Sequence, residues 1–218
     1  MAGVRERQQK LFGRGEGTDR IAFFSDAVFA IALTLLVLDI RLPEGLADGE
    51  LWDALRELWP QFFAYVLTFA VLGINWITHH RKFRVMRRFD TGLIWINLAL
   101  LLFVALAPFP TSVLAEYGTA PAVVLYAGEV AMLSILQAAL WVYAYRRGLL
   151  DDSVDAGLFR FTLVNVLVNP IVFLLTIPVA LLASPVVAML CWFLLWPAGA
   201  IATAVAARRI DRADAATR

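Results

Sequence analysis

The sequence predicts an all-α, polytopic integral membrane protein with six transmembrane helices. Three observations predict this class. Of the 218 residues, 61% are hydrophobic, whereas soluble domains are roughly 45–50% apolar. Apolar runs recur at about 20 residues, the length that a helix needs to cross a hydrocarbon layer about 30 Å thick. Basic residues, finally, gather in alternate connections between these runs.

Six segments qualify as spans, and each is predicted to be helical. They show no period-two alternation, and a single strand in lipid would leave its backbone polar groups without partners. The third segment is short and runs into Pro108 and Pro110, so the sequence does not fix its end. The fifth and sixth segments are close enough to form a tight hairpin. The predicted spans are residues 20–41, 60–78, 91–106, 121–145, 158–182 and 185–206.

The positions of the basic residues predict the orientation. All but two of the 19 Lys and Arg residues lie near the start of the first span, after the sixth, or in and beside the second and fourth connections. The exceptions, Arg41 and Arg56, lie on the opposite side among acidic residues. The positive-inside rule therefore places both termini in the cytoplasm. The chain divides into a cytoplasmic tail over 1–17, a six-helix transmembrane domain over 18–207 and a second cytoplasmic tail over 208–218.

A short amphipathic stretch precedes the second span. The sequence ELWDALRELWP, residues 50–60, places Trp52, Leu55 and Trp59 at helical spacing. We expect a short helix in the outer interface, with its tryptophans at the depth of the lipid headgroups.

The sequence contains no motif for catalysis or for binding a cofactor. It lacks a glycine-rich phosphate loop, a C-x-x-C pair, H-E-x-x-H and G-x-S-x-G. His79 and His80 are adjacent, so on a helix they point about 100° apart and form a poor metal pair. The lone Cys191 cannot form an internal disulfide. We therefore expect no enzyme, no resident cofactor and no resident metal, and a net charge of +1 gives no indication of nucleic-acid binding.

Two polar residues, Ser25 and Asp26, interrupt the first span. A carboxylate at the centre of a bilayer costs about 2.5–3.5 kcal/mol, so such groups usually face protein or water. Asp26 follows Arg20 by about 9 Å along a helix, which places it in the cytoplasmic third of the bilayer. There it still needs polar partners.

The end of the second span offers such partners at the same depth. It carries Trp76, His79, His80 and Arg81. We hypothesise that the serine and the carboxylate of the first span hydrogen-bond to this tryptophan and the two histidines, and so tie the first two helices together. The alternative is N-terminal capping of the first helix, because Ser and Asp favour early helical positions.

The opposite face of the first helix is apolar. At about 100° per residue, Ala27, Ile31, Leu35 and Leu38 fall roughly opposite the carboxylate, with Thr34 at the edge of the stripe. On its own, an apolar stripe of this spacing is typical of helix packing or lipid contact. The two faces of this helix should therefore have different roles.

Two motifs in this topology resemble one family. The first motif is an R-x-x-x-F-S-D signature at the start of the first span. The second motif, WITHHRKF, lies at the end of the second span. Both resemble the transmembrane protein 175 family, the endosomal and lysosomal potassium channels and their prokaryotic relatives. The resemblance covers about residues 18–206 as a single six-helix repeat, as in bacterial and archaeal members, whereas animal members carry two repeats. The signature residues of the first motif are Arg20, Phe24, Ser25 and Asp26.

The resemblance implies a homotetramer whose pore is lined by the first helix of each subunit. Carried over by position, Ile31 is the main hydrophobic constriction, Leu35 and Leu38 lie one and two turns further out, and Thr34 adds a hydroxyl ring. The implied function is passive potassium conduction of modest selectivity, since the T-V-G-Y-G carbonyl cage is absent. The expected partners are other copies of the chain, membrane lipids and permeating K⁺, in the plasma membrane of a prokaryote.

Two alternatives stay open at this point. A secondary or proton-coupled transporter is favoured by Glu129 in the fourth span, since ionisable residues in membranes often relay protons. Several amide side chains in the spans fit that alternative too, or plain interhelical hydrogen bonding worth about 0.6 kcal/mol on average. A membrane scaffold without transport would show no conductance. The amides are Asn75, Asn97, Gln137, Asn165 and Asn169.

Overall fold

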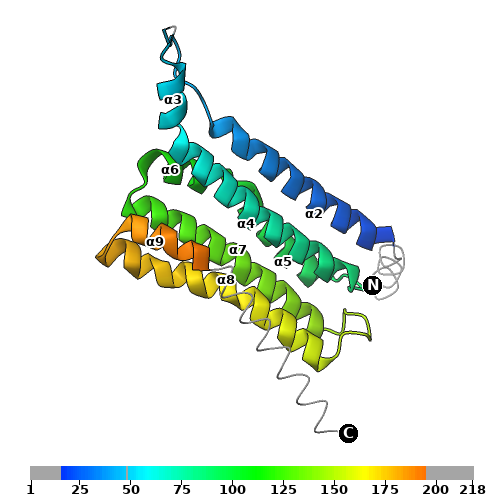
Figure 1. Ribbon diagram of the computed structural model, residues 1–218. Coiled ribbons are helices and arrows are strands. Elements are labelled where there is room, and N and C mark those ends of the chain that lie inside the picture. Colours follow the sequence, from blue (N-terminus) through cyan, green and yellow to red (C-terminus); the bar gives the residue numbers. More distant parts are fainter. Residues whose placement is uncertain (1–15, 48, 195–218) are drawn as a thin grey trace, which may run out of the picture.

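The protein, described here from a computed structural model, forms a bundle of helices (Figure 1). The structure describes residues 16–47 and 49–194. Apart from one isolated bridge between Met86 and Leu150, these residues contain no β structure. The elements in chain order are α2 (Glu16–Leu35), η1 (Leu36–Asp39), α3 (Leu51–Glu57), α4 (Trp59–Arg84), α5 (Thr91–Leu106), α6 (Pro108–Tyr117), α7 (Ala120–Arg146), α8 (Ala156–Leu182), α9 (Pro185–Cys191) and η2 (Trp192–Leu194).

Within the described residues, five helical segments are long and apolar enough to cross a membrane. They correspond to the first five predicted spans. Of the sixth, residues 185–206, only α9 and η2 are described, and the rest lies outside the described residues, as do most of the two predicted tails. The all-α, multi-pass character of the chain is thereby confirmed. The five segments are Arg20–Asp39, Trp59–Arg84, Thr91–Tyr117, Ala120–Arg146 and Ala156–Leu182.

The third span is longer than the sequence indicated, because helix α6 continues the path of α5 after a single break at Ala107. Pro108 and Pro110 do not end the span, since both lie in the first turn of α6, where a backbone N–H has no intrahelical partner to lose. The N–H of Thr111 already donates to the carbonyl of Ala107.

The second span is also longer than predicted. Helix α4 continues past Thr78 to Arg84, so the two histidines and the basic residues after them are helical. The prediction stopped where charged residues begin, but Lys82 and Phe83 are buried against neighbouring helices. Tertiary packing therefore carries this helix through a polar sequence.

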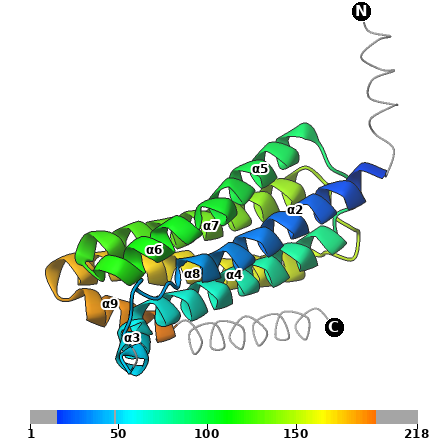
Figure 2. The same ribbon diagram turned by 90° about the horizontal axis from the view of Figure 1, so that it is seen from above.

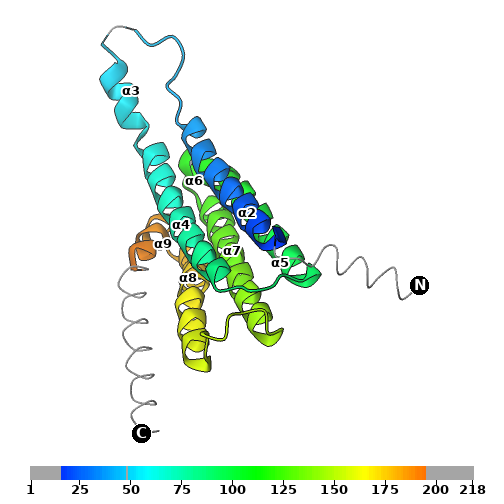
Figure 3. The same cartoon turned by 90° about the vertical axis from the view of Figure 1, so that its right-hand side faces the viewer.

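Helix α7 lies at the centre of the bundle, packed against α5 and α6 on one side and α8 on the other (Figures 2 and 3). The core has two clusters. One joins α2, α4, α5 and α7 around Phe29, Leu72 and Leu100. The other joins α6 to α9 around Tyr126 and Phe173, whose ring centroids are 6.2 Å apart.

The described connections 85–90 and 147–155, which contain or adjoin most of the described basic residues, meet at one end of the bundle. The N–H of Arg87 donates to the carbonyl of Leu149 at 2.9 Å, and its Nε donates to Asp151 at 2.6 Å. Helix α3 lies at the other end (Figure 1), and the Trp52 and Trp59 side chains are 73% and 71% exposed. The expected short helix before the second span is thus present. These two connections and the acidic connection before α4 lie at opposite ends of the bundle.

Candidate functional site

Helix α2 and the turn η1 after it have one face that packs against the rest of the chain. Ser25, Phe29, Ala32 and Leu36 are buried, and their spacing of three and four residues defines a single stripe. Their partners come from α4 and α5. This stripe fixes the rotation of α2 about its axis, and therefore decides which of its side chains face away from the other helices.

A buried polar network lies at the N-terminal end of this stripe. The predicted orientation places that end toward the cytoplasm. The amide nitrogen of Asn97 donates to Ser25 Oγ at 3.0 Å, and Ser25 donates in turn to the carbonyl of Ile21 at 2.9 Å. With that amide orientation, Asn97 Oδ1 accepts from His79 Nε2 at 2.8 Å. The imidazole also stacks on Phe83, with ring centroids 4.0 Å apart. The network joins α2, α4 and α5.

Asp26 makes a second, more exposed connection between α2 and α4. Its Oδ1 accepts from Trp76 Nε1 at 2.8 Å, and its Oδ2 lies 3.6 Å from His80 Nδ1. The carboxylate side chain is 29% exposed, so it keeps some access to its surroundings. The expected tie between the first two helices is present in part: Asp26 bonds to Trp76 as predicted, whereas Ser25 bonds to Asn97 of α5 rather than to the tryptophan or a histidine.

The capping alternative for Ser25 and Asp26 is wrong. Helix α2 begins at Glu16, so both residues lie more than two turns inside it. Their side chains bond to other helices rather than to free N–H groups at a helix start.

Sequence reasoning missed the role of Asn97. It appeared only as one of several amides in the spans, yet it bridges Ser25 and His79, which do not bond directly. The bonds of the network in the described residues do not include Arg20, Phe24 or Arg81. Arg20 and Phe24 are exposed, and Arg81 instead lines a cavity on the other side of α4.

The other face of α2 is not covered by any of the described residues. Ile31, Leu35 and Leu38 are 58%, 42% and 56% exposed. Thr34 is exposed too, and its hydroxyl donates to the carbonyl of Ile31 at 2.8 Å. The α-helix ends at Leu35, and Leu38 belongs to the 3₁₀ turn η1. At about three residues per turn, that change keeps Leu38 in line with Leu35.

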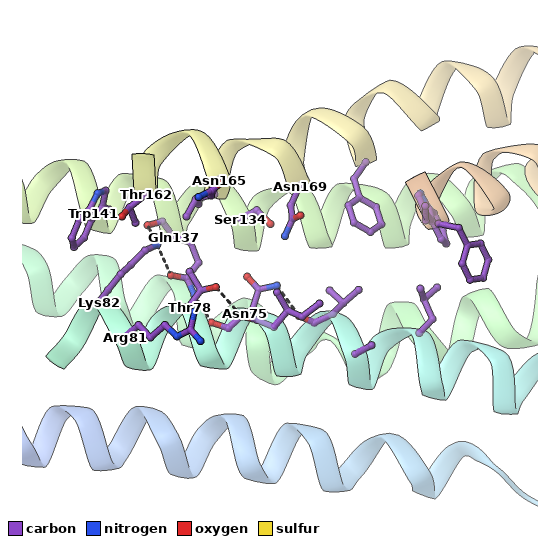
Figure 4. A pocket seen from close by; sticks show the side chains of 18 of the residues that line it. Asn75, Thr78, Arg81, Lys82, Ser134, Gln137, Trp141, Thr162, Asn165 and Asn169 are labelled. Atoms are coloured by element: carbon purple, nitrogen blue, oxygen red, sulfur yellow. Dashed lines mark hydrogen bonds between the residues drawn. The ribbon is translucent and has the colours of Figure 1, made fainter. Parts of the chain in front are cut away.

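A cavity of about 1060 Å³ lies between α4, α7 and α8, on the side of α4 away from α2 (Figure 4). Polar side chains from all three helices gather at one end of it. The amine of Lys82 donates to the backbone carbonyl and to Oε1 of Gln137, at 2.9 and 3.1 Å. The Gln137 amide donates to the carbonyl of Asn75 at 3.1 Å.

No group of three or more potential metal ligands occurs among the described residues. Long apolar helices tied by buried amides, a serine and a histidine define an all-α, multi-pass membrane protein. Comparison with known sequences places it more closely: the chain belongs to the TMEM175 family of channels. The family profile, described as "Endosomal/lysosomal potassium channel TMEM175", matches residues 20–108, which hold both halves of the polar tie.

Three named relatives support this assignment. A potassium channel of Streptomyces collinus is 39% identical over 172 residues, which are 76% of this chain and 84% of the relative. An endosomal/lysosomal proton channel of Bos taurus is 32% identical over 139 residues, but this chain spans only 29% of its length. The crystal structure of a lysosomal potassium-selective channel TMEM175 homolog from Chamaesiphon minutus superposes with a TM-score of 0.69 at 31% identity. The superposition covers 86% of this chain and 98% of the Chamaesiphon chain.

Proposed function

We propose that the chain is one subunit of a homotetrameric, potassium-permeable cation channel of modest selectivity. Conduction is passive and passes through a hydrophobic constriction formed by α2 of the four subunits. Two findings support potassium as the permeant ion. The Streptomyces relative is named a potassium channel, and the superposed Chamaesiphon homolog is described as potassium-selective.

The observation that carries the proposal is the division of α2 into two faces. The stripe from Ser25 to Leu36 is buried, and the polar network holds it there. The opposite stripe from Ile31 to Leu38 is exposed in the described part of the chain and can meet other copies of it. A helix anchored to its own subunit along one side is well suited to present the other side to a central axis.

Ile31 forms the narrowest ring in this proposal, with Leu35 and Leu38 above it. An apolar ring that is narrow excludes water, so an ion would lose its hydration there, and conduction stops by dewetting. A small rotation of α2 widens the ring and lets hydrated K⁺ through. The Thr34 hydroxyl oxygen keeps lone pairs for a passing cation while its proton bonds to the helix carbonyl.

This constriction gives only modest selectivity for potassium over sodium, since side chains replace a rigid cage of carbonyls. The ion is the permeant species, and the channel needs no cofactor. The channel lies in the plasma membrane of a prokaryote, with its basic connections in the cytoplasm.

The test is conductance of the purified protein in planar bilayers. Ile31→Asn places an amide in the constriction, so the leak should rise and the potassium to sodium ratio should change. The matched control is Leu102→Asn, at a residue of α5 that is 66% exposed but outside the stripe. Unaltered currents in Ile31→Asn would remove Ile31 from the pore.

One observation keeps a secondary or proton-coupled transporter as a second candidate. Glu129 in α7 is 6% exposed, and its Oε1 has no hydrogen-bond partner among the described residues. Channel flux is non-saturating and follows voltage alone, whereas coupled transport saturates and requires a second ion gradient. Recordings with and without a pH gradient separate the two, and they also test proton permeation, the activity in the name of the Bos taurus relative.

A further inference from the structure

The cavity between α4, α7 and α8 changes character along its length. Its apolar part is lined by side chains such as Phe62, Val66 and Ala70 of α4, together with Phe173 of α8. From Asn75 onward, toward the basic end of α4, polar side chains stand among apolar ones such as Leu158 and Phe161, and Figure 4 shows the labelled polar side chains gathered in that part. A cavity with one polar and one apolar part matches a ligand of the same amphipathic form.

The polar part carries positive charge without a counter-ion. Lys82 is 2% exposed, and within the part of the chain that the structure describes its amine bonds to the neutral oxygens of Gln137. Arg81 lines the same part, and none of the described lining residues is acidic. Burying a charged group without an opposite charge is costly in a membrane span. An anion in this part of the cavity would supply that charge.

A second observation points to a ligand at the same place. Ser134 of α7 lines the cavity and is 1% exposed, yet its Oγ has no hydrogen-bond partner among the described residues. It lies one helical turn from Gln137, which holds the Lys82 amine. A buried hydroxyl without a partner is unusual, and an acceptor bound beside Lys82 would satisfy it.

We infer that the cavity binds an anionic phospholipid, with its phosphate beside Lys82 and Ser134 and its acyl chain in the apolar part. The chemistry of each part selects one end of the molecule. The volume of about 1060 Å³ lies just above the usual range for small-molecule sites, roughly 300–1,000 Å³. The basic end of α4 lies at headgroup depth under the predicted orientation, where anionic lipids attract Lys and Arg. This site is separate from the α2 face and does not depend on the proposed conduction.

The test is native mass spectrometry of the purified full-length protein in mild detergent. The probes are dioleoyl phosphatidylglycerol, dioleoyl phosphatidylcholine and inorganic phosphate. The wild type should bind phosphatidylglycerol about tenfold more tightly than phosphatidylcholine. Both lipids carry the phosphate, but the choline cation of phosphatidylcholine is repelled by Arg81 and Lys82. Lys82→Met should abolish that preference, and Ser134→Ala should reduce it.

Two further variants keep the test decisive if Lys82→Met does not fold. Ala70→Trp fills the apolar part and should weaken binding of both lipids, whereas Arg88→Gln, an exposed cation outside the cavity, should leave both unchanged. Equal binding of the two lipids by the wild type would overturn the proposal. Phosphatidylglycerol binding that survives Ala70→Trp would also overturn it, because the lipid would then bind elsewhere on the protein. Phosphate binding as tight as the lipid would assign the site to a free anion instead.

Discussion

Asn97 is the residue on which the fixed rotation of α2 most depends, and its removal gives a prediction of definite size. Asn97→Ala leaves His79 without its partner and takes one of two hydrogen bonds from Ser25. A buried polar group left unsatisfied costs about 1–3 kcal/mol, while interhelical hydrogen bonds in membranes average about 0.6 kcal/mol and reach about 1.7. We therefore expect a loss of about 1–3 kcal/mol in the free energy of unfolding.

The coupling between Asn97 and Ser25 should be smaller. Ser25→Ala removes the acceptor for the Asn97 amide but also the bond to the Ile21 carbonyl. A double-mutant cycle with Asn97→Ala isolates the shared bond, which should contribute about 0.6 kcal/mol. The remainder of the Asn97 effect then belongs to His79.

The assay is unfolding in mixed detergent micelles, followed by circular dichroism, with Leu102→Ala as the control on the same helix. Leu102 is 66% exposed, so its truncation should change the free energy of unfolding little. An Asn97→Ala variant no less stable than the control, or a cycle with no coupling to Ser25, would refute the anchoring argument.

Two further predictions concern the ends of this network and the loops beside it. Asp26→Asn removes the charge that faces His80. Because the site is partly exposed, the free energy of unfolding should fall by no more than about 1 kcal/mol. A thermal midpoint and currents both equal to the wild type would show that the charge has no part in the tie. In the loop over residues 147–155, hydrogen bonds lower the pKa of Asp151 from 3.8 to about 2. The largest contributions come from the backbone and hydroxyl of Ser153, and a smaller one comes from Arg87. A folded-state pKa below the unfolded one stabilises the fold above about pH 4, and that contribution is lost as the pH falls toward 2. The wild type should thus lose stability over this window more steeply than Asp151→Asn, and equal slopes in acid titrations would contradict this cause.

Hydropathy and charge were enough to predict most of the fold. The first five spans lie where the sequence put them, since a span is defined by a long apolar run and basic flanks. The errors in the prediction concern the C-terminal ends of the second and third spans. The prediction stopped the second span at Thr78 and left the third undefined at Pro108, where packing and helix geometry override local sequence.

The candidate site was predictable only in part. Depth along the helix was enough to pair Asp26 with Trp76 and His80, and the angular position of Ile31 and Leu35 followed from helical periodicity alone. The role of Asn97 was not predictable in this way, because it depends on how α5 is rotated against α2. The cavity around Lys82 was missed for the same reason, since its lining comes from three helices whose relative rotation no local pattern encodes.

The claim that opposite faces of α2 have separate roles is tested most directly by cysteine accessibility during conduction. In a Cys191→Ser background, Ile31→Cys and Ala32→Cys place a thiol on the exposed and the buried face respectively, the Ala32 side chain being 0% exposed. A charged methanethiosulfonate reagent should reduce the potassium current of Ile31→Cys and leave that of Ala32→Cys unchanged. Block of Ala32→Cys with no effect at Ile31→Cys would contradict the account, because the pore would then border the other side of the helix.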